Sequence, residues 1–454
     1  MVNRLPPSSP DNEDALAAET ERLLGQGEPL LAYNMASTGL QRWPDHLRLR
    51  QLQALSLARS GDIERANRLL TALAQEGLDD AETLGVLART HKDLGLRAQD
   101  AVRRETHLKS SYRLYAQAYS QSLQRGARAG AYYTGINAAA VAVLRGELDE
   151  ARWIAADVHR ICHEVGDSGS VSEYWRQATL GEAALILGDA PAAARHYAQA
   201  MALAQGRYGD LGTTRRQTRL LAEHLAIDDA WLANALHIPP VLVFTGHMVD
   251  QPGRPMPRFP VSLEPVVAEK IRAAVASIRP LAAYGSAACG ADILCLECVR
   301  ELGGEIHIVL PFPPEEFRRS SVESGGAQHW GPRFDRLLAA AHSLTITSDH
   351  RASGSVATFE YANLVLTGLG QLRAQLLDTS LHGLAVWDRG SGGARGGSAS
   401  VVRAWEHCGI PTEHISLADL RAAAGLPAAH GPGSPAAKAS PPSRADHEIK
   451  ALLF

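Results

Sequence analysis

A short glycine-led motif that recurs between helical patterns constrains the first half of this 454-residue chain more than any other feature. The motif is Gly-acid-x-x-x-Ala, and it begins at Gly61, Gly146 and Gly188, each time after an apolar stretch. Glycine ends one helix, the acid suits the start of the next, and alanine lets the two helices approach closely. Helical pairs of this kind bury their apolar faces only by stacking on neighbours. The sequence predicts all-α tetratricopeptide-like helical repeats over 14–235, after a disordered arm over 1–13; generic helical hairpins would give the same all-α stack.

The character of the sequence changes at 238–240, Ile-Pro-Pro. Beyond it, short apolar runs alternate with helical patterns, which predicts a parallel sheet covered on both faces. We therefore expect a Rossmann-like, doubly wound parallel sheet over 238–420. The expected strands are 241–246, 281–285, 306–312, 343–348 and 381–388, and the expected helices are 264–278, 290–302, 329–341, 356–376 and 398–408.

The last thirty residues differ again in composition. Residues 424–446 are rich in Ala, Pro, Gly and Ser, which is typical of a flexible linker. Residues 447–454, His-Glu-Ile-Lys-Ala-Leu-Leu-Phe, return to an apolar, strand-like pattern. This pattern predicts the start of a further domain.

Bulk properties exclude several classes of protein. A net charge of -4 gives no basic field that would attract nucleic acid or an anionic membrane. Five cysteines, an odd and unevenly spaced number, indicate a reducing compartment rather than a disulfide framework. The N-terminus has no signal-peptide pattern, and no apolar run is long enough to span a bilayer. We expect a cytoplasmic protein with no membrane or nucleic-acid partner.

Two glycine-bearing loops that follow predicted strands are candidate phosphate sites, because ligands bind beyond the carboxyl ends of parallel strands. Free amides and the dipole of a helix N-terminus suit a phosphate there. No Walker lysine follows either loop, which argues against a P-loop ATPase. Ordinary turns and a flexible surface loop remain alternatives. The candidate ligand-binding residues are Gly285, Ser286, Gly290 and Asp292 in the first loop and Gly396, Gly397 and Ser398 in the second.

Other polar residues fall near the same predicted sheet edge. Thr245, Gly246 and His247 end the first strand, where a base or ribose would bind. Arg318 is a candidate phosphate clamp. Glu360 is the one carboxylate considered for general acid or base work, against the alternative of a surface residue. No set of residues has metal-ligand spacing: Cys295 and Cys298 lie beside apolar neighbours, which indicates buried thiols.

Polar side chains also interrupt apolar helical patterns in the first half of the chain. Such residues either hydrogen-bond between helices or face a groove. A groove lined by Arg, Asn and Tyr would suit an anionic ligand, and inter-helix bonding explains the pattern equally well. The candidate groove residues are Tyr133, Asn137, Arg176 and Arg219.

Two segments in the first half carry a resemblance to a known family. They are YYTGINAAAVAVLRGELDEA at 132–151 and YWRQATLGEAALILGD at 174–189. Over about 90–235 the chain resembles tetratricopeptide-repeat sensors, which are related to the central region of apoptosis signal-regulating kinases. The resemblance implies a sensor or scaffold, with a protein partner on the repeats.

Residues 240–417 look like the SLOG superfamily, a Rossmann-like group that includes cytokinin-activating phosphoribohydrolases. The segments that carry this likeness are VFTGHMVD, GSAACGADILCLECVRELGGEIHIVLPF and AVWDRGSGGARGGSASVVRAW. The resemblance implies a nucleotide-derived ligand rather than a cofactor. Hydrolase members follow a Pro-Gly-Gly-x-Gly-Thr loop with a catalytic Glu, and the matching stretch 396–403 has no Glu, which favours binding alone.

The last eight residues are similar to the opening strand of class III adenylate or guanylate cyclases. Together these features favour a signal-sensing protein that binds a nucleotide or nucleotide derivative, with a cyclase as possible output. A nucleotide N-glycoside hydrolase and a scaffold without a ligand are the alternatives.

Overall fold

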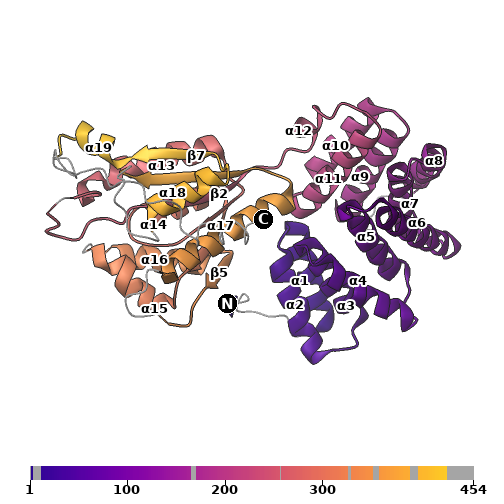
Figure 1. Ribbon diagram of the computed structural model, residues 1–454, viewed down its shortest axis with the longest axis horizontal. Coiled ribbons are helices and arrows are strands. Elements are labelled where there is room, and N and C mark those ends of the chain that lie inside the picture. The colour runs from indigo at the N-terminus through magenta and orange to yellow at the C-terminus, as the bar shows by residue number, and fades with distance from the viewer. Residues whose placement is uncertain are drawn as a thin grey trace. The chain divides into compact units, whose positions relative to one another are not determined.

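The chain folds into a set of helical repeats and a parallel α/β unit, the fold class that the sequence predicts (Figure 1). Contacts divide it into a helical unit, Leu5–Ile238 with Leu376–Asp378, and a sheet unit, Met1–Arg4, Pro239–Gln375 and Thr379–Phe454. None of the helices in the described part of the chain combines the length and apolarity that a bilayer span requires. The computed structural model describes residues 2–3, 12–164, 170–255, 257–325, 329–350, 357–388 and 397–426.

In the helical unit, each helix from α1 to α9 packs on the next along the chain, and α12 packs on α10. Their bounds are α1 Glu13–Gln26, α2 Pro29–Arg42, α3 Leu47–Ser60, α4 Ile63–Gln75, α5 Ala81–Arg97, α6 Ala101–Gln124, α7 Arg128–Leu144, α8 Leu148–Glu164, α9 Ser170–Ile186, α10 Ala190–Leu203, α11 Tyr208–His224 and α12 Leu232–Ala235.

The glycine-led motif works as its residue types predict. Gly61 follows α3 with a φ of 105°, a left-handed conformation that costs glycine little. The side chain of Asp62 then accepts a hydrogen bond from the backbone N–H of Arg65 (3.3 Å) and caps α4. Ala66 is fully buried where the two helices meet. The motif therefore fixes both the turn and the packing of a helical pair.

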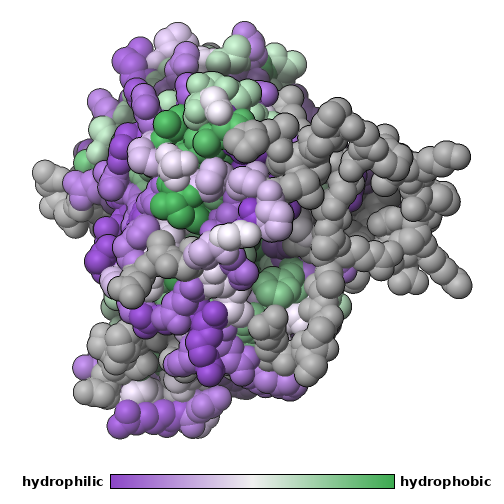
Figure 2. All heavy atoms as spheres, turned by 90° about the vertical axis from the view of Figure 1, so that its left-hand side faces the viewer, coloured by the Kyte–Doolittle hydropathy of each residue, from purple (hydrophilic) through white to green (hydrophobic). Residues whose placement is uncertain are grey.

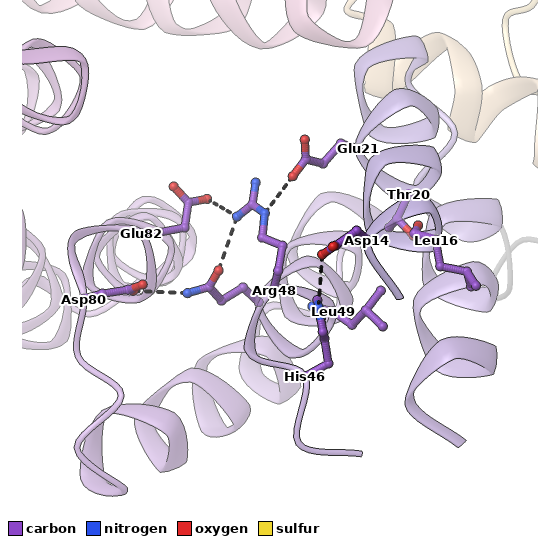
Figure 3. Close-up of polar contacts among 10 residues, drawn as sticks. Asp14, Leu16, Thr20, Glu21, His46, Arg48, Leu49, Asp80 and Glu82 are labelled. Atoms are coloured by element: carbon purple, nitrogen blue, oxygen red, sulfur yellow. Dashed lines mark hydrogen bonds and ion pairs between the residues drawn. The ribbon is translucent and has the colours of Figure 1, made fainter. Parts of the chain in front are cut away.

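The odd-numbered helices form an inner layer, because α1, α3, α5, α7, α9 and α11 each contact the next member of this series. Arg48 on α3 links three of them. It donates to Glu21 of α1 (2.7 Å) and to Glu82 of α5 (2.8 Å), as Figure 3 shows. Here one guanidinium bridges two carboxylates from neighbouring helices of this layer.

The inner layer closes on itself, since α1 also contacts α11. The closure brings Gly27, which follows α1, against Gly209 in the first turn of α11. A Cβ on Gly209 would lie 2.4 Å from the backbone nitrogen of Gly27. The two backbones thus touch without intervening side chains, and α11 contacts α7 and α9 as well as α1. We call this arrangement of the odd-numbered helices the helical ring.

The sheet unit is built on a seven-stranded sheet of order β1-β5-β4-β3-β2-β6-β7. All pairings are parallel except that of the two-residue β1, which is antiparallel to β5. The strands are β1 Val2–Asn3, β2 Val241–Gly246, β3 Ala282–Gly285, β4 Glu305–Leu310, β5 Ser343–Ile346, β6 Leu381–Trp387 and β7 Thr412–Ser416.

Helices cover both faces of this sheet. Leu242 and Phe244 share a core with Ile271 of α13 and Leu294 of α14. Val243 points to the opposite face, where its side chain meets Gly370 of α17. The helices of this unit are α13 Glu264–Ile278, α14 Ala291–Glu301, α15 Pro314–Phe317, α16 Trp330–Ala340, α17 Ala357–Leu377, α18 Ser398–His407 and α19 Leu417–Ala423, with short 3₁₀ or π turns at Val261–Leu263, Arg318–Val322 and Glu323–Gly325.

The structure adds two strands to those expected from the sequence. β7 has the sequence Thr-Glu-His-Ile-Ser, whose polar residues suit an edge strand and hide it from a search for apolar runs. Val2–Asn3, placed by the sequence in a disordered arm over 1–13, pair with β5 instead. Most of the expected linker 424–446, and the whole of 447–454, lie outside the described residues.

Candidate functional site

A cavity of about 330 Å³ lies beyond the ends of β2 and β6, where the strand order of the sheet reverses. From β2 the chain runs through β3, β4 and β5 on one side, whereas β6 and β7 lie on the other. Ligands of open α/β sheets bind at such a switch point, beyond the carboxyl ends of the two central strands. Thr245 and Gly246 line the cavity from β2, and Trp387 and Asp388 line it from the end of β6.

His247 occupies the centre of this switch point. Its backbone N–H donates to the carbonyl of Val386 (2.9 Å), which fixes it beside β6. Burial, and then the guanidinium of Arg258, lower the pKa of His247 to about 4, so the imidazole is neutral at neutral pH. Nδ1 is buried and has no hydrogen-bond partner among the described residues. A buried polar atom of this kind is available to a bound group.

Asp292 lines the cavity from the first turn of α14. Its Oδ2 accepts a hydrogen bond from the backbone N–H of Ala288 (3.3 Å). Burial raises the pKa of Asp292 to about 7, so at neutral pH a large share of molecules carry this carboxyl protonated. In that form the carboxyl is also a hydrogen-bond donor.

The first turn of α18 contributes the opposite wall. Gly397, Ser398 and Ala399 all line the cavity. In the described residues no side chain caps the amides of this turn. Thr245 Oγ1 donates to Ser398 Oγ (3.4 Å), which ties the turn to the end of β2. The turn therefore offers uncapped amides at the positive end of a helix dipole.

The loop between β3 and α14 presents fewer open amides than the sequence suggested. The N–H of Cys289 donates to the carbonyl of Ser321 (2.9 Å), and that of Ala291 donates to the carbonyl of His247 (3.2 Å). Gly290, with a φ of 104°, lies against the backbone of Val249, where a Cβ would come within 2.7 Å of its nitrogen. This loop packs against the end of β2. Ser286 and Ala288 of the loop line the cavity, together with Asp292 of α14.

Several residues singled out in the sequence lie elsewhere. Gly285 packs against the Phe244 ring, and Arg318 pairs with Glu323 (2.9 Å) and Asp335 (3.0 Å). Glu360 does not line the cavity, although Phe359 and Asn363 of the same helix do. Gly396 lies outside the described residues. The structure thus brings together Thr245, Gly246, His247, Ser286, Asp292, Gly397 and Ser398 from the sequence-based set.

Arg258 and Asp388 were not anticipated. Asp388 lines the cavity and directly follows β6. The rule that ligands bind beyond the carboxyl ends of parallel strands, which selected the residues at the end of β2, would therefore also have selected Asp388. Arg258 lies in an irregular segment between β2 and α13, where no periodic pattern points to a role. Its guanidinium supplies positive charge to a cavity that otherwise holds two carboxyl groups, those of Asp292 and Asp388.

The cavity also has an apolar wall. Phe317 is buried, and Phe359, Leu366 and Trp387 are at least partly buried around the same space. On the face of the molecule in Figure 2, coloured side chains are mostly hydrophilic and apolar ones occur in small groups. Within the cavity, the side chains of Phe317, Phe359 and Trp387 offer contacts to flat apolar or aromatic groups of a ligand.

Three of the four polar residues expected in a helical groove have local partners for their side chains. Asn137 Nδ2 donates to the carbonyl of Tyr133 (2.8 Å). Arg176 pairs with Glu173 (2.6 Å), and Arg219 pairs with Asp378 (2.7 Å). Tyr133 lies close enough to Arg59 and Arg89 for their charges to act on its phenol, whose pKa is raised mainly by burial.

Comparisons with known proteins fit a tetratricopeptide-like helical unit. The family model described as Tetratricopeptide Repeats-Sensor matches residues 32–142. A thermophilic tetratricopeptide repeat protein of Thermus thermophilus is 16% identical, with a TM-score of 0.36 over 48% of this chain and 100% of that chain. The Naa15/Naa10 structure bound to HypK-THB is 12% identical, with a TM-score of 0.19 over 80% of this chain and 60% of that chain. No curated protein matches.

Fold and site together define a class: tetratricopeptide-like helical repeats followed by a parallel α/β unit with a cavity at its switch point.

Proposed function

We propose that this chain is a signal-sensing protein whose sheet unit binds a nucleotide or nucleotide derivative in the cavity beyond β2 and β6. The observation that carries the proposal is the neutral imidazole of His247 at the switch point, whose buried Nδ1 has no hydrogen-bond partner within the part of the chain that the structure describes. Uncapped amides of α18 and the Arg258 guanidinium suit a phosphate group. Phe317, Phe359 and Trp387 offer apolar contacts to a base.

A titration of the full chain with ATP, NAD and ADP-ribose tests this proposal. Thermal unfolding and calorimetry report binding, and a ligand at about 100 times its Kd adds about 2.7 kcal/mol of stability. We expect Arg258→Ala to weaken binding by about tenfold or more, because a charge-assisted hydrogen bond to phosphate is lost.

Arg272→Ala is the matched control. Arg272 lies on α13 of the same unit, is 58% exposed and pairs with Glu301 (2.7 Å) away from the cavity lining. It should bind like the wild type. Equal binding by the Arg258 and Arg272 variants, or no binding of any of the three compounds by the wild type, would refute the proposal.

A second candidate function is nucleotide N-glycoside hydrolysis, and Asp292 is the observation that favours it. A carboxyl with a pKa of about 7 in a cavity is suited to general acid or base catalysis. Release of free base from NAD or a nucleoside monophosphate, abolished by Asp292→Asn, would support hydrolysis. Binding without release supports a sensor.

We further propose that the helical repeats relay the bound state, to a protein partner or to a cyclase output of the kind that residues 447–454 resemble. A difference in partner or cyclase activity between ligand-free and ligand-bound protein is the test. Ligand shifts such an equilibrium only by its differential affinity for the two states. We propose a cytoplasmic site of action, and fractionation of cells tests it.

A further inference from the structure

A group of positively charged side chains lies where α3 and α5 meet α11 in the helical ring. Its members come from three odd-numbered helices, and we call them the inner cationic cluster: Arg59 of α3, Arg89 and Lys92 of α5, and Arg216 of α11. Three of these side chains are largely buried, at 12% exposure for Arg59, 18% for Arg89 and 9% for Lys92. Arg216 is exposed.

The cluster is weakly compensated by the carboxylates around it. Arg59 Nη2 lies 3.6 Å from Asp210, which already accepts a closer contact from Arg207 (2.5 Å). Arg89 Nε lies 3.8 Å from Asp93 on its own helix. These distances contrast with the tight contacts of Arg48 on the same ring (2.7 and 2.8 Å).

The two remaining cations are held by neutral groups. Lys92 Nζ donates to Gln217 Oε1 (2.8 Å), and Gln217 in turn donates to Glu182 of α9 (2.9 Å). Arg216 Nη2 donates to the carbonyl of Leu376 (3.1 Å). Burial raises the pKa of Glu182 to about 7, so its carboxyl neutralises only part of the charge of Lys92.

Like-charge repulsion within the cluster is substantial. Burial, and then the charge of Arg89, lower the pKa of Arg59 to about 10. On Arg59, the charge of Arg89 outweighs that of the Asp210 carboxylate. Arg59 Nε is also buried with no hydrogen-bond partner among the described residues. Buried cations that repel one another and retain an unused donor are costly unless an anion joins them.

We propose that the inner cationic cluster binds a small phosphate-bearing anion, at a site formed by none of the residues that line the cavity of the sheet unit. Guanidinium groups match phosphate oxygens in pairs and are poorly hydrated, so they suit such a ligand. Because three members are largely buried, a folded partner would not reach them, whereas a small group would. Arg216 is exposed, so it lies on the side of the cluster that faces solvent. Tyr133 on α7 adds a phenol beside Arg59 and Arg89.

Calorimetric titration of the full chain with inorganic phosphate, pyrophosphate and tripolyphosphate tests this site. We expect binding that strengthens with the charge of the probe and weakens by about tenfold or more in Arg89→Gln. Arg89→Gln should unfold at the same or a higher temperature than the wild type, because it removes the repulsion. Should it fail to fold, Arg216→Gln, at an exposed side chain, replaces it.

Two controls separate this site from the cavity. Arg103→Gln, an exposed residue of α6, should leave probe binding unchanged. In the Arg258→Ala background, where the cavity has lost its guanidinium, Arg89→Gln should still weaken probe binding by about tenfold or more, whereas loss of probe binding in Arg258→Ala with retention in Arg89→Gln would assign the anion to the cavity and overturn the inference. No binding of any probe, or binding of an acidic peptide in place of the phosphates, would overturn it as well.

Discussion

Nε2 of His247 lies 3.6 Å from Oδ1 of Asp388, and the two side chains are only 10% and 6% exposed. The residues follow β2 and β6, which are far apart in the sequence and adjacent in the sheet. Their proximity is therefore a product of the strand order. The strand order thus places a neutral imidazole beside a carboxyl group at the switch point, where the order of the strands reverses.

His247 makes the fold sensitive to acid. Its pKa is about 4 in the folded protein against 6.5 for an ordinary histidine, so the unfolded chain takes up the proton first. The free energy of unfolding therefore falls as the pH drops from about 6.5 to about 4. His247→Gln should lose less stability over this range in urea unfolding, whereas exposed His407→Gln should follow the wild type. Identical pH slopes for all three proteins would contradict the burial of His247.

Asp292 changes the free energy of unfolding with pH in the direction opposite to His247. Its folded pKa of about 7 lies above the ordinary value of 3.8, so the folded protein holds a proton that the unfolded chain has released. Stability from this group is present at low pH and is lost as the pH rises through about 7. Asp292→Asn should stabilise the protein at about pH 8, and the gain should shrink toward about pH 5. A gain that is independent of pH in thermal unfolding would argue against a buried, protonated carboxyl.

Gly285 leaves room for the Phe244 ring, since a Cβ there would lie 1.8 Å from the ring. Gly285→Ala should destabilise the sheet unit by about 1–3 kcal/mol through overpacking. Phe244→Leu in the same chain should restore part of that loss. Gly368→Ala on α17 is the contrasting change, because no described atom lies near its Cβ position. It should stabilise the helix by about 0.5–1 kcal/mol. Denaturant midpoints of the four proteins give the comparison.

Glu182 should set the pH dependence of anion binding in the helical ring. It is influenced by Lys92 and Gln217 and acts on Tyr115 and Tyr197, which are buried phenols. Because its pKa is about 7, its negative charge grows above neutral pH and opposes an incoming anion. Pyrophosphate should bind more tightly at about pH 6 than at about pH 8, and Glu182→Gln should remove most of this difference. A pH profile unchanged in Glu182→Gln would assign the effect to the probe.

The periodic elements could be predicted from the sequence because their signals are local. Apolar runs predicted β2 and β6, and the pair Gly61 and Asp62 predicted the junction between α3 and α4. Part of the cavity was also predictable, since residues after parallel strands converge on one sheet edge. β7 was not, because its polar sequence reflects an edge position that only the assembled sheet defines.

Two arrangements depend on contacts that leave no local pattern. Arg258 lines the cavity from an irregular segment, so its role exists only once the sheet is formed. The inner cationic cluster draws on α3, α5 and α11, whose charged residues look like ordinary solvated positions in the sequence. Contacts of α3 and α5 with Asp210 and Gln217 of α11 bring them together.

The sequence by itself determined two fold classes in one chain, because helix caps, apolar periodicity and strand-ending residues act over a few positions. Tertiary structure alone decided which charged groups meet. The pKa of His247 and that of Glu182 depend on burial and on neighbours brought from other parts of the chain, and the pKa of Asp292 depends mainly on burial in the assembled sheet unit. Electrostatic interaction depends on distance in space and on exclusion of water, and neither is encoded at a single position.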